Sequence, residues 1–285
     1  MRTVTSHLHL LALVLLFMLQ PVAGMSQIVV LRDQEQFNAD SIRRDYDDRP
    51  YFGLYKDNYF TAGTTLGGTP TKTNSDVKFQ ISISQRLTKS TLPLHSYLFL
   101  FYTQKSMWNI FEESMPFHDL NFNPGIGVSR LIIVKGQLVG KATMLIEHES
   151  NGRDGLESRS WNKVSWSGAA FIDPNLMVHA KFWIPIVDGE NNRDILKYSG
   201  IYQAGVQALS SNRRWVLDAT FVKRKGWNFN GNVTLNVGYR LSRKANQFLM
   251  LHYYNGYGEC LLDYNRFHSR LRIGMLIRPN FFSDF

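Results

Sequence analysis

Residues 232–239 read Asn-Val-Thr-Leu-Asn-Val-Gly-Tyr, and this alternation decides the fold class. The apolar residues occupy every second position of the stretch. Successive side chains of a β-strand point to opposite faces, so the stretch predicts a strand with one apolar and one polar face. The same alternation recurs over residues 77–84, 215–221 and 270–277.

About twelve segments of this kind follow one another along the chain, separated by turn-like links. Their centres fall near residues 55, 81, 100, 128, 144, 166, 180, 204, 218, 235, 251 and 273. An exported chain of such strands, rich in aromatic residues and ending in phenylalanine, is typical of a transmembrane β-barrel. A closed barrel satisfies every backbone group inside lipid, which an open sheet cannot do. We therefore expect an all-β, antiparallel transmembrane barrel of about twelve strands. The alternative is a soluble β-sandwich or lipocalin-like barrel with its apolar faces turned inward.

The first 24 residues have the pattern of a cleaved signal peptide. Arg2 gives a charged start, residues 10–19 form an apolar run, and small residues follow Pro21. An uncleaved N-terminal anchor is the alternative. Residues 25–49 are expected to be irregular, and residues 50–285 are expected to form one barrel domain, because no linker, repeat or low-complexity tract divides them.

The charge and cysteine content narrow the class of protein. The formal net charge is +9, but the basic residues are dotted through turns and strands and form no basic arm. We therefore expect anionic lipid or lipopolysaccharide as the partner and no nucleic acid. Cys260 is the single cysteine, so no internal disulfide is expected.

Charged residues on the polar faces are expected to fill the lumen. A barrel of about twelve strands is narrower than the 16–18-stranded barrels that leave open aqueous channels, which argues against a general porin. Among the expected lumen residues are Lys78, Gln80, Arg270 and Arg272, and the expected carboxylate partners of the two arginines are Asp57, Glu259 and Asp263.

Three polar residues continue the apolar faces of two neighbouring segments: His148, Ser150 and Asn162. A polar side chain that faces lipid is costly without a partner. A serine can attack a carbonyl when a nearby histidine takes its proton and a third group orients the histidine. An asparagine can orient the ring without placing an unpaired charge at a lipid boundary. The pattern indicates a catalytic triad, and an ordinary polar loop just above the membrane is the alternative.

Residues 148–153 (His-Glu-Ser-Asn-Gly-Arg) and 158–162 (Ser-Arg-Ser-Trp-Asn) resemble the outer membrane phospholipase A family of Gram-negative bacteria. The resemblance covers residues 50–285. Its further signatures are residues 77–80 (Val-Lys-Phe-Gln), 102–106 (Tyr-Thr-Gln-Lys-Ser), 113–117 (Glu-Ser-Met-Pro-Phe) and 256–265 (Gly-Tyr-Gly-Glu-Cys-Leu-Leu-Asp-Tyr-Asn).

The resemblance implies an enzyme in the bacterial outer membrane that hydrolyses the sn-1 and sn-2 acyl esters of phospholipids to lysophospholipid and fatty acid. Ser150 would be the nucleophile, His148 the general base and Asn162 the orienting residue. The Gly152 amide, with a calcium ion, would stabilise the oxyanion. Members of the family use calcium and act as homodimers.

The resemblance also implies a calcium site shared between two subunits. The backbone oxygens of Arg153 and Ser158, with the Ser158 hydroxyl, would bind the ion, and Ser114 would come from the partner subunit. Gln104 matches a glutamine of the dimer interface, and a lumen-facing strand glutamine is its alternative. The sequence departs from the family at Asp154-Gly155, where an acid followed by proline is usual, which leaves any second calcium site in doubt.

Two rival functions remain at this stage. One is a catalytically silent barrel, a small pore or structural protein. The other is an exported soluble hydrolase or lipid-binding protein. Cys260 replaces a small polar residue of the family, and it is expected to serve packing rather than chemistry.

Overall fold

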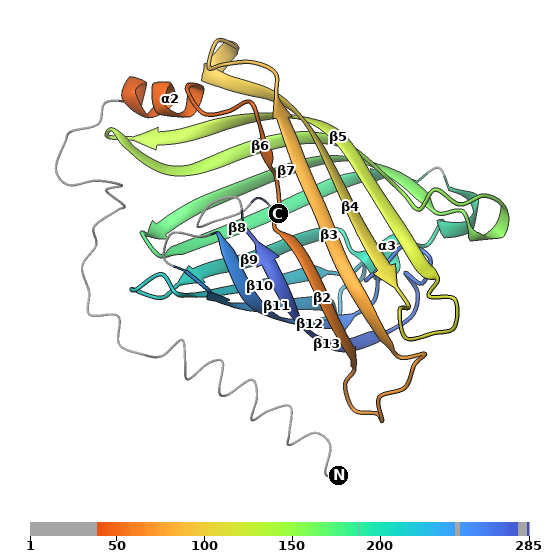
Figure 1. The fold of residues 1–285 in the computed structure, drawn as a ribbon. Coiled ribbons are helices and arrows are strands. Elements are labelled where there is room, and N and C mark those ends of the chain that lie inside the picture. The colour runs from red at the N-terminus through yellow and green to blue at the C-terminus, as the bar shows by residue number, and fades with distance from the viewer. Residues whose placement is uncertain (1–38, 188, 243–245, 279–283, 285) are drawn as a thin grey trace.

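The computed structural model describes residues 39–187, 189–242, 246–278 and 284. The expected signal peptide, residues 1–24, lies outside them. Figure 1 shows long, tilted strands as the dominant elements. The elements are α2 (Ala39–Asp47), β1 (Phe52–Leu54), β2 (Asn58–Thr65), β3 (Ser75–Arg86), η1 (Pro93–His95), β4 (Ser96–Trp108), β5 (Phe117–Val134), β6 (Gln137–Ser150), η2 (Gly155–Glu157), β7 (Ser160–Asp173), β8 (Leu176–Ile186), η3 (Glu190–Asn192), α3 (Leu196–Ser199), β9 (Tyr202–Leu209), β10 (Trp215–Lys223), β11 (Gly231–Arg240), β12 (Gln247–Gly256) and β13 (His268–Ile277).

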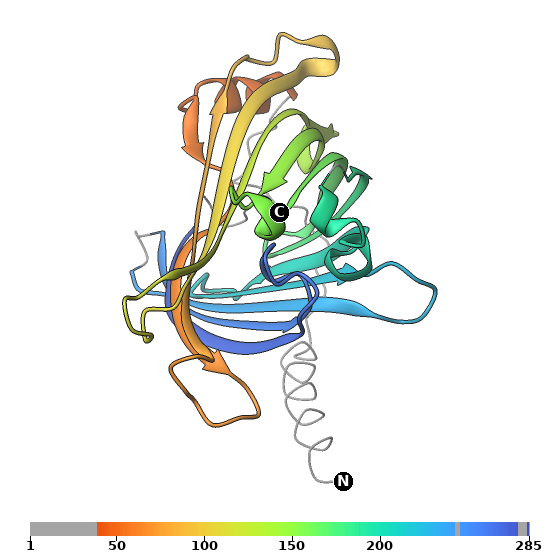
Figure 2. The same ribbon diagram turned by 90° about the vertical axis from the view of Figure 1, so that its right-hand side faces the viewer.

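The strands close into a barrel. From β2 onward, each strand pairs antiparallel with the next strand in sequence, and the last strand, β13, pairs with β2 through residues such as Ile273 and Ala62. β1 and β2 both pair with β3 and act as one interrupted barrel strand, so the ring has 12 strands. The sheet curves round until its two ends meet (Figure 2). The predicted fold is confirmed, and the twelve expected centres all fall within these strands or between β1 and β2.

The barrel has an apolar outer surface. Ile81, Ile146 and Ile273 are exposed and point outward, whereas alternate residues such as Ser82 and Glu147 are buried inside. This arrangement is the reverse of a soluble sandwich, so that alternative is wrong. Within the described residues, no helix is long and apolar enough to cross a membrane.

The two ends of the barrel differ in their connections. One end, called the short-turn end here, includes the two-residue turns 135–136 and 174–175. The other, the long-loop end, carries residues 66–74, 109–116, 151–159, 187, 189–201, 224–230 and 257–267. Outer-membrane barrels turn their short connections to the periplasm and their long ones to the cell exterior.

Paired charges fill the lumen. Arg272, which is fully buried, donates to Asp76 at 2.7 Å and to Glu259 at 2.6 Å, and Lys78 approaches Glu259 at 3.1 Å. Asp57 does not contact the expected arginines, because Arg278 at the end of β13 binds it at 2.6 Å. Asp263, in the β12–β13 loop, instead pairs with His118 at 2.8 Å and with Arg266 at 3.5 Å.

Residues 39–47 form a helix at the short-turn end, where an irregular segment was expected. The guanidinium of Arg86 donates to the backbone oxygens of Tyr46, Asp47 and Arg49 and so caps the end of α2. The carboxylate of Asp47 also accepts the Ser90 hydroxyl at 2.7 Å. These partners come from the distant β3–β4 region, and helix ends need such partners for their free carbonyls. The expectation is wrong here because local sequence does not reveal them.

Candidate active site on the membrane-facing surface

The β6–β7 hairpin brings His148 and Asn162 together. The two residues are direct cross-strand partners, and His148 Nδ1 lies 2.8 Å from Asn162 Oδ1. An amide oxygen only accepts hydrogen bonds, so Nδ1 carries the proton and donates it. In the neutral ring, Nε2 is then unprotonated and able to take a proton.

Ser150 lies two residues beyond His148 on the same outward face of β6. Its partners across the sheet are Ser160 on β7 and Phe122 on β5. Within the described residues, no hydrogen bond joins the Ser150 hydroxyl to His148. Catalytic hydrogen bonds are often long before substrate binds and shorten in the complex.

Ion pairs inside the barrel fix the hairpin that carries these residues. Glu149, whose side chain points inward between those of His148 and Ser150, accepts Lys163 at 2.7 Å and Trp161 Nε1 at 3.1 Å. These inward partners keep the alternation in register, so His148 and Ser150 must face outward. Sequence reasoning missed Glu149 and Lys163, although their parity was a usable signal.

A buried asparagine shapes the loop between the two strands. Asn151 is 3% exposed; its Nδ2 donates to the Glu157 oxygen at 2.9 Å, and its Oδ1 accepts the Arg159 amide at 2.9 Å. This residue was also missed by sequence reasoning, because a loop asparagine looks like a solvent-exposed residue. Its hydrogen bonds, with that of its own amide to the Arg159 oxygen, close residues 151–159 into a compact loop beside the expected site.

Gly152 has a backbone that other residues rarely adopt. Its φ is +65°, and a Cβ atom there would lie 2.9 Å from the Phe122 ring. Within the described chain, no hydrogen bond uses the Gly152 N–H. An open amide two residues after the serine is a suitable donor for an oxyanion.

Two carbonyl oxygens of the same loop were expected to bind calcium. The Arg153 oxygen accepts no hydrogen bond from the described residues, so it is open to a cation. The Ser158 oxygen accepts the Arg159 guanidinium at 2.9 Å. Neutral oxygens suit calcium. The described residues contain no group of three or more His, Cys, Asp or Glu that could hold a metal ion. The Arg153 oxygen is thus available to a cation, whereas the Ser158 oxygen already accepts from Arg159, and one chain offers only a partial set of the expected ligands.

Ser114 lies on another exposed loop of the long-loop end. It has a φ of 65°, and Met115 after it has a φ of 45°. The Met115 oxygen accepts Trp108 Nε1 at 2.9 Å, which ties this loop to β4. Within one described chain, no hydrogen bond links Ser114 to residues 151–159, so the structure does not bring it to the triad.

Gln104 faces outward, so its lumen-facing alternative is wrong. Its side chain accepts the Tyr102 hydroxyl at 2.9 Å and donates to the Ser106 hydroxyl at 3.2 Å. It pairs across the sheet with Phe122, which in turn pairs with Ser150. Gln104 and Ser150 therefore lie about 10 Å apart, two strand spacings along one row.

Cys260 is a free, buried cysteine of the β12–β13 loop. Burial raises the pKa of its thiol to about 12, so the thiol is protonated at neutral pH and unreactive.

The fold and the site together define a transmembrane β-barrel with a serine, a histidine and an asparagine on its membrane-facing surface. The family model described as Phospholipase A1 matches residues 50–277. The chain belongs to this family, and it is an outer-membrane barrel.

Individual relatives agree with this assignment. The chain is 31% identical to phospholipase A1 of Escherichia coli strain K12 over 213 residues, 72% of this chain and 71% of the relative. Its structure is similar to outer membrane phospholipase A from E. coli, with a TM-score of 0.71 and 29% identity over 82% of this chain and 95% of that chain. It is also similar to the Salmonella typhi outer membrane phospholipase dimer with bound calcium, with a TM-score of 0.70 and 29% identity over 80% and 92% of the two chains.

Proposed function

We propose that this chain hydrolyses the sn-1 and sn-2 acyl esters of phospholipids to lysophospholipid and fatty acid. The observation that carries the proposal is the His148–Asn162 pair on the outward face, with Ser150 beside it. Outward neighbours such as Ile146 and Ile186 are exposed and apolar, so acyl chains can lie against the site. The names of the relatives support the same substrate class.

The chemistry follows from the positions of these side chains. Ser150 Oγ attacks the ester carbonyl carbon while His148 Nε2 takes its proton. The carbon–oxygen bond to glycerol then breaks, and His148 returns the proton to the leaving oxygen. Water attacks the acyl-serine, His148 takes its proton, and Ser150 recovers a proton as the fatty acid leaves. Asn162 accepts from Nδ1 throughout and so keeps Nε2 directed toward Ser150.

The Gly152 N–H is placed to donate to the oxygen that becomes negative during each attack. The Arg153 and Ser158 oxygens would hold calcium, which would add positive charge for that oxygen when bound. The missing ligands would come from Ser114 of a second copy, with Gln104 in the interface between the copies. A relative has been solved as a dimer with bound calcium, which supports a calcium site in a dimeric form of this chain.

The first experiment tests the nucleophile. Ser150→Ala is expected to lower acyl release from phospholipid micelles by about 10⁴-fold or more, because a triad without its nucleophile loses most of its rate. The matched control is Ser160→Ala, since Ser160 is the cross-strand partner of Ser150 on the same face. The control should keep activity within about twofold. A Ser150→Ala protein that works within a few-fold of wild type rules out this nucleophile, and an inactive wild type in calcium favours the silent barrel.

The second experiment tests the shared calcium site. A Ser114→Ala dimer has intact triads and weakened metal sites, whereas a Ser150→Ala dimer has intact metal sites and no nucleophile. A mixed dimer restores one whole site, so co-refolding the two variants should give more activity than either alone, and chelation should abolish the gain. Activity equal to the average of the parents, in a sample shown by cross-linking to contain mixed dimers, contradicts a shared site.

A further inference from the structure

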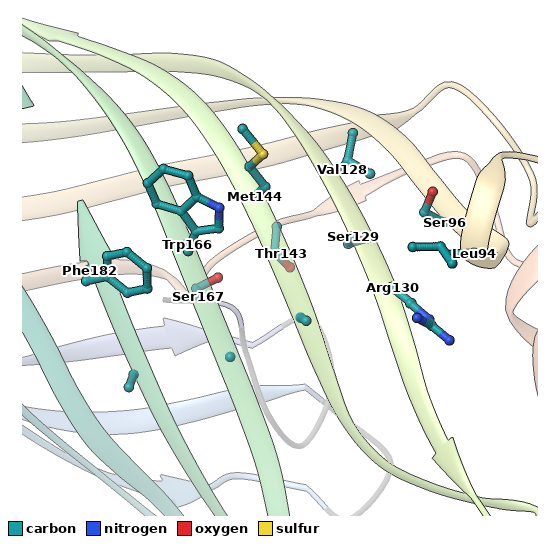
Figure 3. Close-up of a pocket in the computed structure, with 13 residues that line it drawn as sticks. Leu94, Ser96, Val128, Ser129, Arg130, Thr143, Met144, Trp166, Ser167 and Phe182 are labelled. Carbon is teal, nitrogen blue, oxygen red and sulfur yellow. The ribbon is translucent and has the colours of Figure 1, made fainter. Parts of the chain in front are cut away.

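A groove crosses the outer surface of β5, β6, β7 and β8 away from the proposed active site. It encloses about 510 Å³ and reaches the segment before β4 at the short-turn end. We call it the Arg130 groove. Its lining comes from these four strands, from Leu94 in η1 and from Ser96 at the start of β4 (Figure 3).

Strand register explains why the surface is hollow here. Two adjacent outward rows cross the same four strands. One row is large and apolar: Val128, Met144, Trp166 and Phe182. The next row toward the short-turn end begins with Arg130 and continues with residues that have small or no side chains: Ala142, Gly168 and Ala180. A Cβ atom added to Gly168 would meet nothing within 4 Å, so the floor is open space.

Aromatic rings stand beside this floor. Trp166 and Phe182 stack with centroids 5.2 Å apart and planes 13° apart. Figure 3 shows these rings on one side of the groove and Leu94, Ser96 and Arg130 on the other. The groove therefore offers an apolar wall at one side and a guanidinium at the other.

Arg130 is an unusual residue for this surface. It is exposed and makes no hydrogen bond or ion pair within the described residues. Among the described strands, the charged residues on the outward face are Arg130 and two residues at strand ends, Lys223 at the end of β10 and Asp173 at the end of β7. An unpaired charge on a membrane-facing surface is costly, so such a residue indicates a functional partner.

We propose that the Arg130 groove binds one phospholipid of the periplasmic leaflet, with its phosphate at Arg130 and an acyl chain along the Trp166–Phe182 wall. A guanidinium binds phosphate through two parallel hydrogen bonds. The groove lies toward the short-turn end, which faces the periplasm in outer-membrane barrels. Ala142 is six residues from His148 along β6, about 20 Å, so this lipid is not the substrate at Ser150.

Native mass spectrometry of the full chain in detergent can count bound lipid. The Ser150→Ala background prevents any hydrolysis of the probe, which is dioleoyl phosphatidylethanolamine. Arg130→Gln removes the phosphate ligand, and Gly168→Leu fills the floor. The matched control is Arg214→Gln, since Arg214 lies near the same end but outside the groove and contacts Tyr239. Dioleoylglycerol and inorganic phosphate test which part of the lipid is recognised.

The parent and Arg214→Gln should each retain one phospholipid. Arg130→Gln and Gly168→Leu should each weaken binding about tenfold, because a charge-assisted contact or the acyl contact is lost. The parent should bind dioleoylglycerol as weakly as the Arg130→Gln variant binds phospholipid, because both pairs lack the contact between phosphate and guanidinium. Inorganic phosphate should not displace the bound phospholipid. When Ser150 is left intact, the Arg130→Gln variant should hydrolyse micellar phospholipid at the same rate as the wild-type chain.

Three results would overturn the proposal. The first is equal retention by Arg130→Gln and the parent. The second is equal binding of dioleoylglycerol and phospholipid, since the phosphate is then not recognised. The third is a loss of dimer, seen as a change in mass, in place of a loss of lipid. The test does not depend on turnover, so its failure would leave the proposed hydrolase standing.

Discussion

Arg272 and His148 are polar residues on opposite faces of the same barrel wall, and their surroundings differ. Arg272 is 1% exposed and contacts the carboxylates of Asp76 and Glu259. His148 is partly exposed, and its ring contacts the neutral amide of Asn162. The lumen groups satisfy each other and hold the wall together. The outward group keeps one ring nitrogen available, which is what a proton-transfer catalyst needs.

This comparison predicts that stability and activity can be changed separately. Glu259→Gln should lower the free energy of unfolding by about 3–5 kcal/mol, because it leaves Lys78 and Arg272 buried without their shared carboxylate. Urea unfolding of the barrel in lipid vesicles measures this loss. Asp45→Asn, which breaks the exposed Asp45–Arg49 pair, should cost less than about 1 kcal/mol. A stable Glu259→Gln barrel without activity would contradict the separation.

The outward pair should show the opposite behaviour. Asn162→Ala should lower kcat by about 10–100-fold, since His148 loses the hydrogen bond that orients it but can still act as a base. The residual rate should exceed that of Ser150→Ala, and the urea midpoint should move little. Steady-state acyl release at saturating phospholipid measures the effect. Full activity of the variant would show that Asn162 does not orient the histidine.

The smallest effect concerns the glycines of the loop above the site. Gly152 and Gly155 both have positive φ, +65° and +55°, but only the added Cβ at Gly152 would meet the Phe122 ring. Each alanine variant should lose about 1 kcal/mol of stability from the backbone alone. Gly152→Ala should also lose about tenfold in turnover, because its amide must shift from the oxyanion position. Equal turnover of the two variants would remove Gly152 from that role.

Alternation in the sequence was sufficient to predict the strands and the facing of the proposed triad. The period of two places His148, Ser150 and Asn162 outward, and the register of β6 and β7 agrees. The same rule would have placed Gln104 outward, but a glutamine is equally common on a polar face. Parity therefore identifies which face a residue is on, whereas residue type alone does not.

Contacts between distant segments could not be predicted from the sequence. Asp57 binds Arg278 rather than Arg270 or Arg272, because barrel closure brings the end of β13 beside the start of β2. Helix α2 depends on Arg86, about forty residues away, for its cap. The first contact depends on barrel closure and the second on the pairing of β1 with β3, and alternation specifies neither pairing.

The pairing of β2 with β13 also determines when the wall can be completed. Residues near 60 can pair only after residues near 275 have been made, as Phe60 does with Met275. The last pairing to form therefore joins one of the first strands of the chain to the last. Until then, the growing sheet presents two unpaired edges that invite association with other chains. The chain therefore remains prone to aggregation until its last strand has paired. A chaperone that covers both edges and dissociates only when the last strand pairs would fit this topology.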